Sequence, residues 1–231
     1  MPRPTPANRL KELLDCAIGV FLEEGYRRAQ MADVAEAMGV AKGTVYLYVE
    51  SKEALFEAAM FHAAGEAQEP TQQELPLAAR PTEALAEALR EVLDREAVPP
   101  SLDRALARKR APNPRAELEG IVRELYRISH DNRTVIQLID RCAKDRPDLA
   151  ETFYRHGRMV QLDRLARLLT QRIEAGQLRP VPDASVAARF IIETIATWAV
   201  HRHWDPAPQP IDSAIAEETV VHFVLAGLIE E

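Results

Sequence analysis

The sequence has few of the features that mark secreted, membrane-spanning or metal-binding proteins. It contains 2 cysteines among 231 residues, Cys16 and Cys142, without Cys-x-x-Cys or Cys/His spacing, which excludes a disulfide scaffold and a zinc finger. No apolar run reaches the ~18–20 residues that cross a bilayer, and the opening MPRPTPANRLKELLD lacks the apolar core of a signal peptide. We therefore expect a cytoplasmic chain whose two thiols are buried.

Catalytic signatures and β structure are also missing from the sequence. We find no Gly-rich phosphate loop, no His-Glu-x-x-His and no useful Ser/His/Asp spacing, so an all-helical enzyme is a minor alternative. His201 and His203 invite a metal interpretation, but on a helix residues i and i+2 diverge by about 200° and cannot share one ion. We expect no cofactor and no metal.

Helical periodicity dominates what the sequence does contain. Leu10, Leu13, Leu14, Ala17 and Phe21 recur at the spacing of one helix face. Similar patterns, separated by prolines and glycines, predict further helices at 51–68, 82–97, 101–111, 115–130, 133–144, 147–175, 183–203 and 211–229. The fold class expected is all-α, with a small N-terminal domain at 1–52, a connecting helix at 51–68 and a larger helical domain at 69–231.

The net charge of −7 first argues against a partner with a phosphate backbone. Residues 1–52, however, carry equal numbers of basic and acidic side chains, so the excess acid lies entirely beyond them. Because charges more than ~8–10 Å apart are screened at physiological salt, a neutral head with basic groups on one face can still bind DNA.

The stretch MADVAEAMGVAKGTVYLYVESK, residues 31–52, reads as two short helices joined by a tight turn. Val34, Ala35 and Met38 share one face, and Gly39 stands where a left-handed residue closes a helix. Val45 is the apolar anchor of the second helix. This is the helix-turn-helix pattern, in which the second helix enters the DNA major groove.

The run AKGTVYLYVESKEALF resembles the recognition helix and following helix start of TetR-type transcriptional regulators, and the likeness covers Leu10 to about Phe56. Ala41 replaces the Ser or Thr that usually caps the recognition helix in that family. The resemblance implies contacts with phosphates, bases or thymine methyls. The residues carried over are Lys42, Gly43, Thr44, Tyr46, Tyr48 and Lys52, and we add Arg27 and Arg28 as possible phosphate contacts.

The remainder resembles the C-terminal domain of the AcrR/AefR-like branch through RPDLAETFYRHG, LARLLTQRIEAGQLRP and DASVAARFIIETI. Such domains dimerise, and dimerisation also follows from geometry, because one recognition helix reads only a few base pairs. The last two helices carry more apolar surface than one face needs. The predicted interface residues are Phe190, Ile191, Ile195, Val220, Phe223, Val224 and Leu228.

Such domains also bind a small molecule, here expected to be hydrophobic or aromatic. The candidate pocket residues are Arg123, Tyr126, Arg127, His130, Gln137, Phe153, Tyr154, His156, Met159 and Trp198. We therefore expect a homodimeric repressor released from a palindromic DNA operator by an unidentified effector, with an activator or a ligand-insensitive DNA-binding regulator as the alternative.

Overall fold

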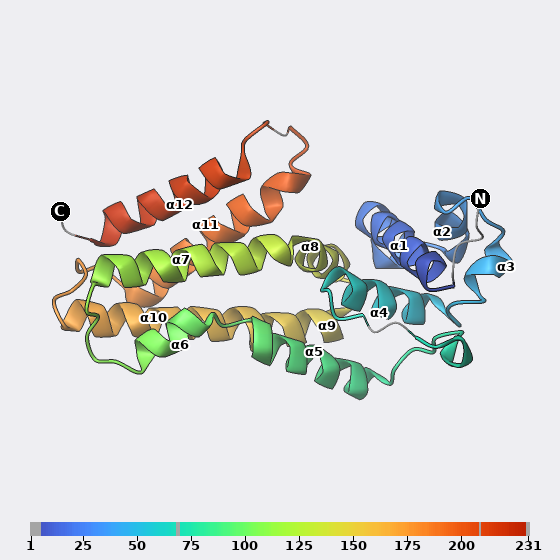
Figure 1. Ribbon diagram of the computed structural model, residues 1–231, viewed down its shortest axis with the longest axis horizontal. Helices are drawn as coiled ribbons and strands as arrows, with labels where there is room; N and C mark the ends of the chain where they lie inside the picture. Colours follow the sequence, from blue (N-terminus) through green and yellow to red (C-terminus); the bar gives the residue numbers. More distant parts are fainter. Residues whose placement is uncertain (1–5, 68–69, 208, 230–231) are drawn as a thin grey trace. The chain divides into compact units, whose positions relative to one another are not determined.

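The computed structural model describes residues 6–67, 70–207 and 209–229, and Figure 1 shows that these form an assembly of helices. Within the described ranges the chain has no strand beyond an isolated bridge between Val49 and Leu77. The all-α fold class is thus confirmed. The chain divides into two compact units. The first comprises the residues up to Ala88 with Thr134–Glu151, and the second comprises Leu89–Arg133 and the residues from Thr152 onward.

The first unit is built on α1 (Pro6–Arg28), α2 (Met31–Ala37), α3 (Lys42–Val45) and α4 (Lys52–Ala63). The apolar face predicted for α1 is buried against α4. Phe21 meets Phe56 edge to face with 5.0 Å between ring centroids, a favoured aromatic geometry. Gly25, with φ 76°, ends the regular part of α1 as its sequence position predicts.

The connecting helix is shorter than the predicted 51–68. Ser51 caps α4 by accepting a hydrogen bond from the Ala54 N–H at 3.1 Å, but the helix ends at Ala63. Gly65 then adopts φ 71°, which turns the chain out of the helix. Position 68 lies outside the described residues. Residues 70–80, which we call the strap, follow and lead into α5 (Thr82–Glu96).

The first unit also contains α8 (Arg133–Cys142) from Thr134 onward and α9 (Pro147–Thr152). The Arg141 guanidinium donates to the carbonyls of Leu22 and Glu23 at 3.0 and 2.8 Å. These carbonyls lie at the end of α1, where helical acceptors lack partners of their own. The sequence boundary at 52–69 did not foresee this return of residues 134–151 to the N-terminal helices.

The second unit contains α6 (Pro100–Leu106), α7 (Pro114–Asp131), α10 (Met159–Glu174), α11 (Ala184–Ala199) and α12 (Ser213–Leu228). A π-helical segment, Phe153–Arg158, precedes α10 without a break. Helix α11 packs on α7, α10 and α12 (Figure 1).

An ion pair fixes α7 and α10 within this unit. Arg172 is 2% exposed, and its guanidinium donates to Glu117 at 2.6 Å and to the carbonyls of Arg108 and Ala105 at 3.0 and 2.8 Å. The Arg-rich stretch at 107–115 is held to the end of α10 as well, because Arg110 donates to the Ala175 carbonyl at 2.6 Å. At least one charge of this stretch, that of Arg110, therefore contributes to holding the helices together.

Candidate nucleic-acid interface

The turn between α2 and α3 has the geometry that its sequence predicts. Gly39 has φ 69°, and its N–H donates to the Glu36 carbonyl at 2.9 Å. The Val40 N–H donates to the Ala35 carbonyl, also at 2.9 Å. Ala35 and Val45 are buried, so the two helices meet through small and branched apolar side chains. Helices α2 and α3 and the turn between them therefore form a packed helix-turn-helix.

Helix α3 and the turn that follows it present a mixed polar and apolar surface. Val45 is fully buried, whereas Lys42 and Gly43 are exposed. Tyr46 is 41% exposed, and Thr44 and Tyr48 are partly exposed. Ammonium, hydroxyl and ring edge are the groups that contact phosphates and base edges. The roles predicted for these five residues in DNA contact stay predictions.

Leu47 is a candidate that the sequence interpretation missed. It is 65% exposed beside Tyr46, although it is a large apolar side chain. An apolar group in the major groove can contact the thymine methyl. Its position two residues after the buried Val45, and therefore on the opposite face of the segment, was the available signal.

Lys52 lies at the start of α4 and is held by the protein itself. Its ammonium donates to the carbonyls of Tyr26, Arg27 and Ala29 at 3.0, 3.3 and 3.2 Å. It also lies 4.8 Å from the centroid of the Tyr26 ring. The predicted phosphate contact is untested, but the structure gives this residue a second role as the cap of the α1 terminus.

The two arginines before α2 are both exposed. Arg28 pairs with Glu24 one turn earlier, at 3.3 Å. The backbone N–H of Arg27 donates to Asp145 at 3.0 Å, which fixes the main chain here and leaves the guanidinium outside that bond. The predicted phosphate contacts of these two arginines stay predictions.

A polar cleft of about 360 Å³ in the first unit is lined by residues of α1, α4, the strap, the start of α5 and the α8–α9 turn. The Tyr26 hydroxyl donates to Glu53 at 3.0 Å, and the Arg146 guanidinium lies 5.4 Å from the Tyr26 ring. Burial, followed by this hydrogen bond, raises the pKa of Tyr26 to about 12. Arg146 in turn donates to Asp148 and lowers the pKa of that carboxyl. These pairings hold α1, α4 and the α8–α9 turn together.

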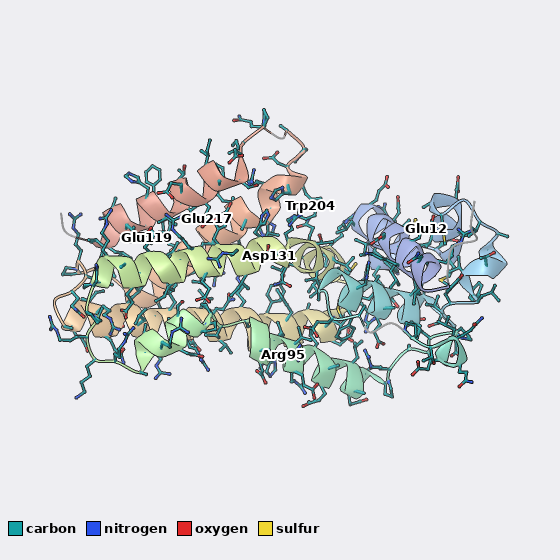
Figure 2. The ribbon with its side chains drawn as sticks, in the orientation of Figure 1. Glu12, Arg95, Glu119, Asp131, Trp204 and Glu217 are labelled. Carbon is teal, nitrogen blue, oxygen red and sulfur yellow. The ribbon has the colours of Figure 1, made fainter. Side chains whose placement is uncertain are left out.

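The predicted pocket residues are divided between the two units and stay predictions. Gln137 belongs to the first unit and the other nine to the second. Arg123 is bound to Glu119, Glu217 and Glu218, and Figure 2 labels Glu119 on α7 and Glu217 on the neighbouring α12. Met159 is exposed. The others are divided between packing and surface: Tyr126 donates to the Trp198 carbonyl, His130 stacks on Tyr126, Phe153 contacts Tyr154, and Arg127 is exposed.

A cleft of about 400 Å³ in the second unit includes one predicted residue, His156. Its remaining walls come from the end of α5, from α6 and from α10. Apolar side chains alternate with arginines: the lining includes Leu93, Ala97, Val98, Pro100, Val160, Arg95, Arg104 and Arg164, together with Asp94 and Asp103. Arg164 is paired with Asp103. No sequence motif marks this cleft, because its lining comes from two stretches, 93–104 and 156–164, that lie far apart in the sequence.

The predicted interface residues divide into two groups. Phe190 and Phe223 are 69% and 70% exposed. The other five lie within the core of the single chain: Ile191, Ile195, Val220, Val224 and Leu228. The helical period was correctly assigned, but the predicted set mixed the inward face of α11 and α12 with the outward one. Val186 and Ile215 are exposed on the same two helices and were not in the predicted set.

Metal and membrane signals are both absent from the described part of the chain. No group of three or more His, Cys, Asp or Glu side chains in the described ranges could hold a metal ion. Nor does any helix of those ranges combine the length and apolarity needed to cross a bilayer. His203 lies 5.6 Å, between ring centroids, from His130 rather than beside His201.

Comparison with known families agrees with this geometry. Residues 13–59 match the model of bacterial regulatory proteins of the tetR family. Residues 118–226 match the C-terminal domain of AefR-like transcriptional repressors. The chain belongs to the TetR family, and it is therefore a DNA-binding transcriptional regulator.

Individual relatives span nearly the whole chain. The fatty acid metabolism regulator protein of Bacillus subtilis (strain 168) is 23% identical over 94% of this chain and 94% of its own length. The transcriptional repressor KstR2 of Mycolicibacterium smegmatis is 25% identical over 97% and 93%. The solved structure of the ketosteroid transcriptional regulator KstR2 of Mycobacterium tuberculosis shares the fold, with a TM-score of 0.61, 20% identity and 96% coverage of both chains. All three relatives are named as regulators.

Proposed function

We propose that the protein is a homodimeric repressor that leaves a palindromic operator when an effector binds its second unit. The observation that carries the proposal is the uncovered apolar surface of α11 and α12. A single helix-turn-helix reads too few base pairs for specific binding, so a regulator of this kind needs two heads about one DNA turn, ~34–36 Å, apart.

The proposed interface consists of Val186, Phe190, Ile215 and Phe223, each between 64% and 70% exposed. Phe190 and Phe223 also border an apolar groove of about 400 Å³ between the two helices. Fully burying a large apolar side chain stabilises by about 1.5–3 kcal/mol. Eight such side chains across a two-fold axis would therefore contribute on the order of 10–20 kcal/mol, comparable to or above the estimated 4–15 kcal/mol cost of association.

The proposed effector site is the cleft of the second unit. Leu93, Val98 and Val160 offer apolar walls, and three arginines stand at its edge. This combination suits a hydrophobic or aromatic molecule that carries an acidic group. The relatives named for fatty acid metabolism and ketosteroids support an effector with a large apolar body.

The experiment for the operator is fluorescence anisotropy with short duplexes tiled across the DNA beside the gene, at two salt concentrations. We expect tight binding to one palindromic tile that weakens steeply with salt. Addition of acidic hydrophobic compounds should then release that tile. Retention of the tile in the presence of every such compound would contradict the effector proposal and favour a ligand-insensitive regulator.

The experiment for the dimer is sedimentation of a Phe190→Asp, Phe223→Asp double variant. We expect a monomer with unchanged helical content, because charges on this surface oppose its burial. Met159→Asp is the matched control, since Met159 is also exposed and apolar but lies outside α11 and α12. A double variant that sediments as the wild-type dimer would place the interface elsewhere.

A further inference from the structure

The strap returns to the helix-turn-helix and bonds to the end of its recognition segment. The Leu77 N–H donates to the Tyr48 carbonyl at 2.8 Å, and the Glu50 N–H donates to the Leu77 carbonyl at 2.9 Å. Between these two bonds, Val49 lies opposite Leu77 in a parallel bridge and is fully buried. The recognition segment is thereby tied to a piece of chain nearly thirty residues further on.

The far end of the strap is tied to α4. The Arg80 N–H donates to Glu57 at 2.9 Å, and the Arg80 guanidinium pairs with the same carboxylate. That guanidinium also lies 4.9 Å from the centroid of the Phe61 ring. Glu57 is buried, so the pair is desolvated on the carboxylate side. Arg80, three residues after Leu77, therefore provides a second and independent attachment of the strap.

The near end of the strap is held by its own hydrogen bonds. The N–H and hydroxyl of Thr71 donate to the Glu74 carboxylate at 2.7 and 2.8 Å. The strap is thus folded into a local turn before Leu77 and attached to α4 after it. A segment restrained in this way loses little entropy when it bonds to the recognition segment.

The recognition segment needs such a partner. Helix α3 has 4 residues, and its N-cap residue Ala41 makes no side-chain bond. Helices this short are only marginally stable, because ordering the residues of the first turn costs more free energy than its hydrogen bond contributes. The last carbonyls of a helical segment also lack donor partners within it. Leu77 provides a donor to the carbonyl of Tyr48, which is the last of the exposed ring-bearing residues proposed to contact DNA.

We propose that the strap is a positioning element that fixes the recognition segment in its DNA-reading orientation through the backbone of Leu77. Leu77 itself contacts no DNA in this scheme. Its N–H and carbonyl hold Tyr48 and Glu50, and thereby the direction of Tyr46 and Leu47. The proposal rests on the DNA-binding function and adds a determinant of specificity that lies outside the helix-turn-helix.

The test is a Leu77→Pro variant, which removes the N–H that binds Tyr48 and leaves the Leu77 carbonyl in place. Ala78→Pro is the matched control, because the Ala78 N–H meets no acceptor among the residues that the structure describes. Hydrogen exchange of the amides at 46–50 should rise about 5-fold in Leu77→Pro and stay at the wild-type rate in Ala78→Pro. The amides of α11 and α12 should exchange normally in both variants.

The same variants are then compared on the operator tile and on a scrambled duplex of equal length. We expect Leu77→Pro to lower the ratio of operator to scrambled affinity about 5-fold, or about 1 kcal/mol at 1.4 kcal/mol per tenfold. A general loss of folded protein would reduce both affinities equally and leave the ratio unchanged. Ala78→Pro should keep the wild-type ratio.

Unchanged exchange at 46–50 in Leu77→Pro overturns the proposal, and so does faster exchange with an unchanged affinity ratio. If Leu77→Pro does not fold, a variant with residues 71–79 replaced by a Gly/Ser linker of equal length gives the same two readings. If the wild-type chain binds no tile, the operator proposal fails by itself. The exchange rates then still decide whether the strap holds the recognition segment.

Discussion

The ammonium of Lys52 offers a direct test of what stabilises the DNA-binding part of the first unit. Its three hydrogen bonds to the carbonyls of Tyr26, Arg27 and Ala29 cap the C-terminal end of α1. A positive charge at this end also interacts favourably with the negative end of the helix dipole. We therefore consider the substitution Lys52→Met, which keeps most of the apolar stem and removes the charge.

The magnitude follows from those contacts. A hydrogen bond to a charged group contributes about 1.5–3 kcal/mol, and a lysine at a helix end about 0.3–1 kcal/mol. Because Lys52 is partly exposed and solvent screens its charge, we take the lower part of the combined range, about 2 kcal/mol. For a chain of this size, 1 kcal/mol corresponds to about 2–4 °C, so the melting temperature should fall by about 4–8 °C.

The assay combines thermal unfolding with the salt dependence of operator binding. If Lys52 serves the α1 terminus, Lys52→Met lowers the melting temperature and leaves the salt slope unchanged. A lysine that neutralises a phosphate instead contributes about 0.9 to the slope of log affinity against log salt. Lys42→Met is the matched control: Lys42 is exposed on α3, so its loss should reduce the slope and spare the melting temperature.

The reasoning is refuted if Lys52→Met melts like the wild type and its salt slope falls as in Lys42→Met. That result would mean that the three carbonyl bonds contribute nothing measurable and that Lys52 acts on the phosphate backbone, as the family resemblance implies. A fall in both quantities would assign both roles to one ammonium.

Three further predictions concern ionisable groups that are paired within the fold. Arg172→Met should destabilise the chain to urea by about 3–5 kcal/mol, because it leaves Glu117, whose side chain is only 9% exposed, without its closest partner, and adding Glu117→Gln should recover part of that loss. The Arg146 hydrogen bond lowers the pKa of Asp148, so their pairing stabilises the fold fully above the ordinary carboxyl pKa of about 4 and is lost as the pH falls through the lowered pKa of the folded state; Arg146→Gln should flatten the fall in melting temperature that is recorded below about pH 4. The pKa of Tyr26 is raised to about 12, so the fold should lose stability as the pH rises from about 10 to 12, and Tyr26→Phe should remove that loss from melts recorded across the interval.

Much of the first unit was predictable because the forces that shape it act over a few residues. The burial of Leu10, Leu13 and Phe21 follows from helical periodicity. The left-handed turn at Gly39 follows from the absence of a Cβ, and the cap at Ser51 from its hydroxyl. Each of these signals is complete within one or two helical turns.

The candidate sites beyond the helix-turn-helix were less predictable. Helical spacing identified Phe190 and Phe223 but could not separate the outward face of α11 and α12 from the inward one. Both faces carry large apolar side chains, so the polar contrast that normally orients a helix is weak. The effector cleft brings together residues from α5, α6 and α10, and no short motif records that meeting.

The amino-acid sequence by itself determined the helices, the tight turn that joins α2 to α3, and membership of a DNA-binding family. Only the tertiary structure decided that Lys52 closes α1 and that Leu77 bonds to the recognition segment. It also decided that residues 134–151 join the N-terminal helices. The physical reason is that periodicity, caps and turns depend on neighbours along the chain. The pairing of a distant donor with an unpaired carbonyl depends instead on how the packed helices bring the chain back. The sequence does not mark such pairs, because nearly every residue carries the same backbone donor and acceptor.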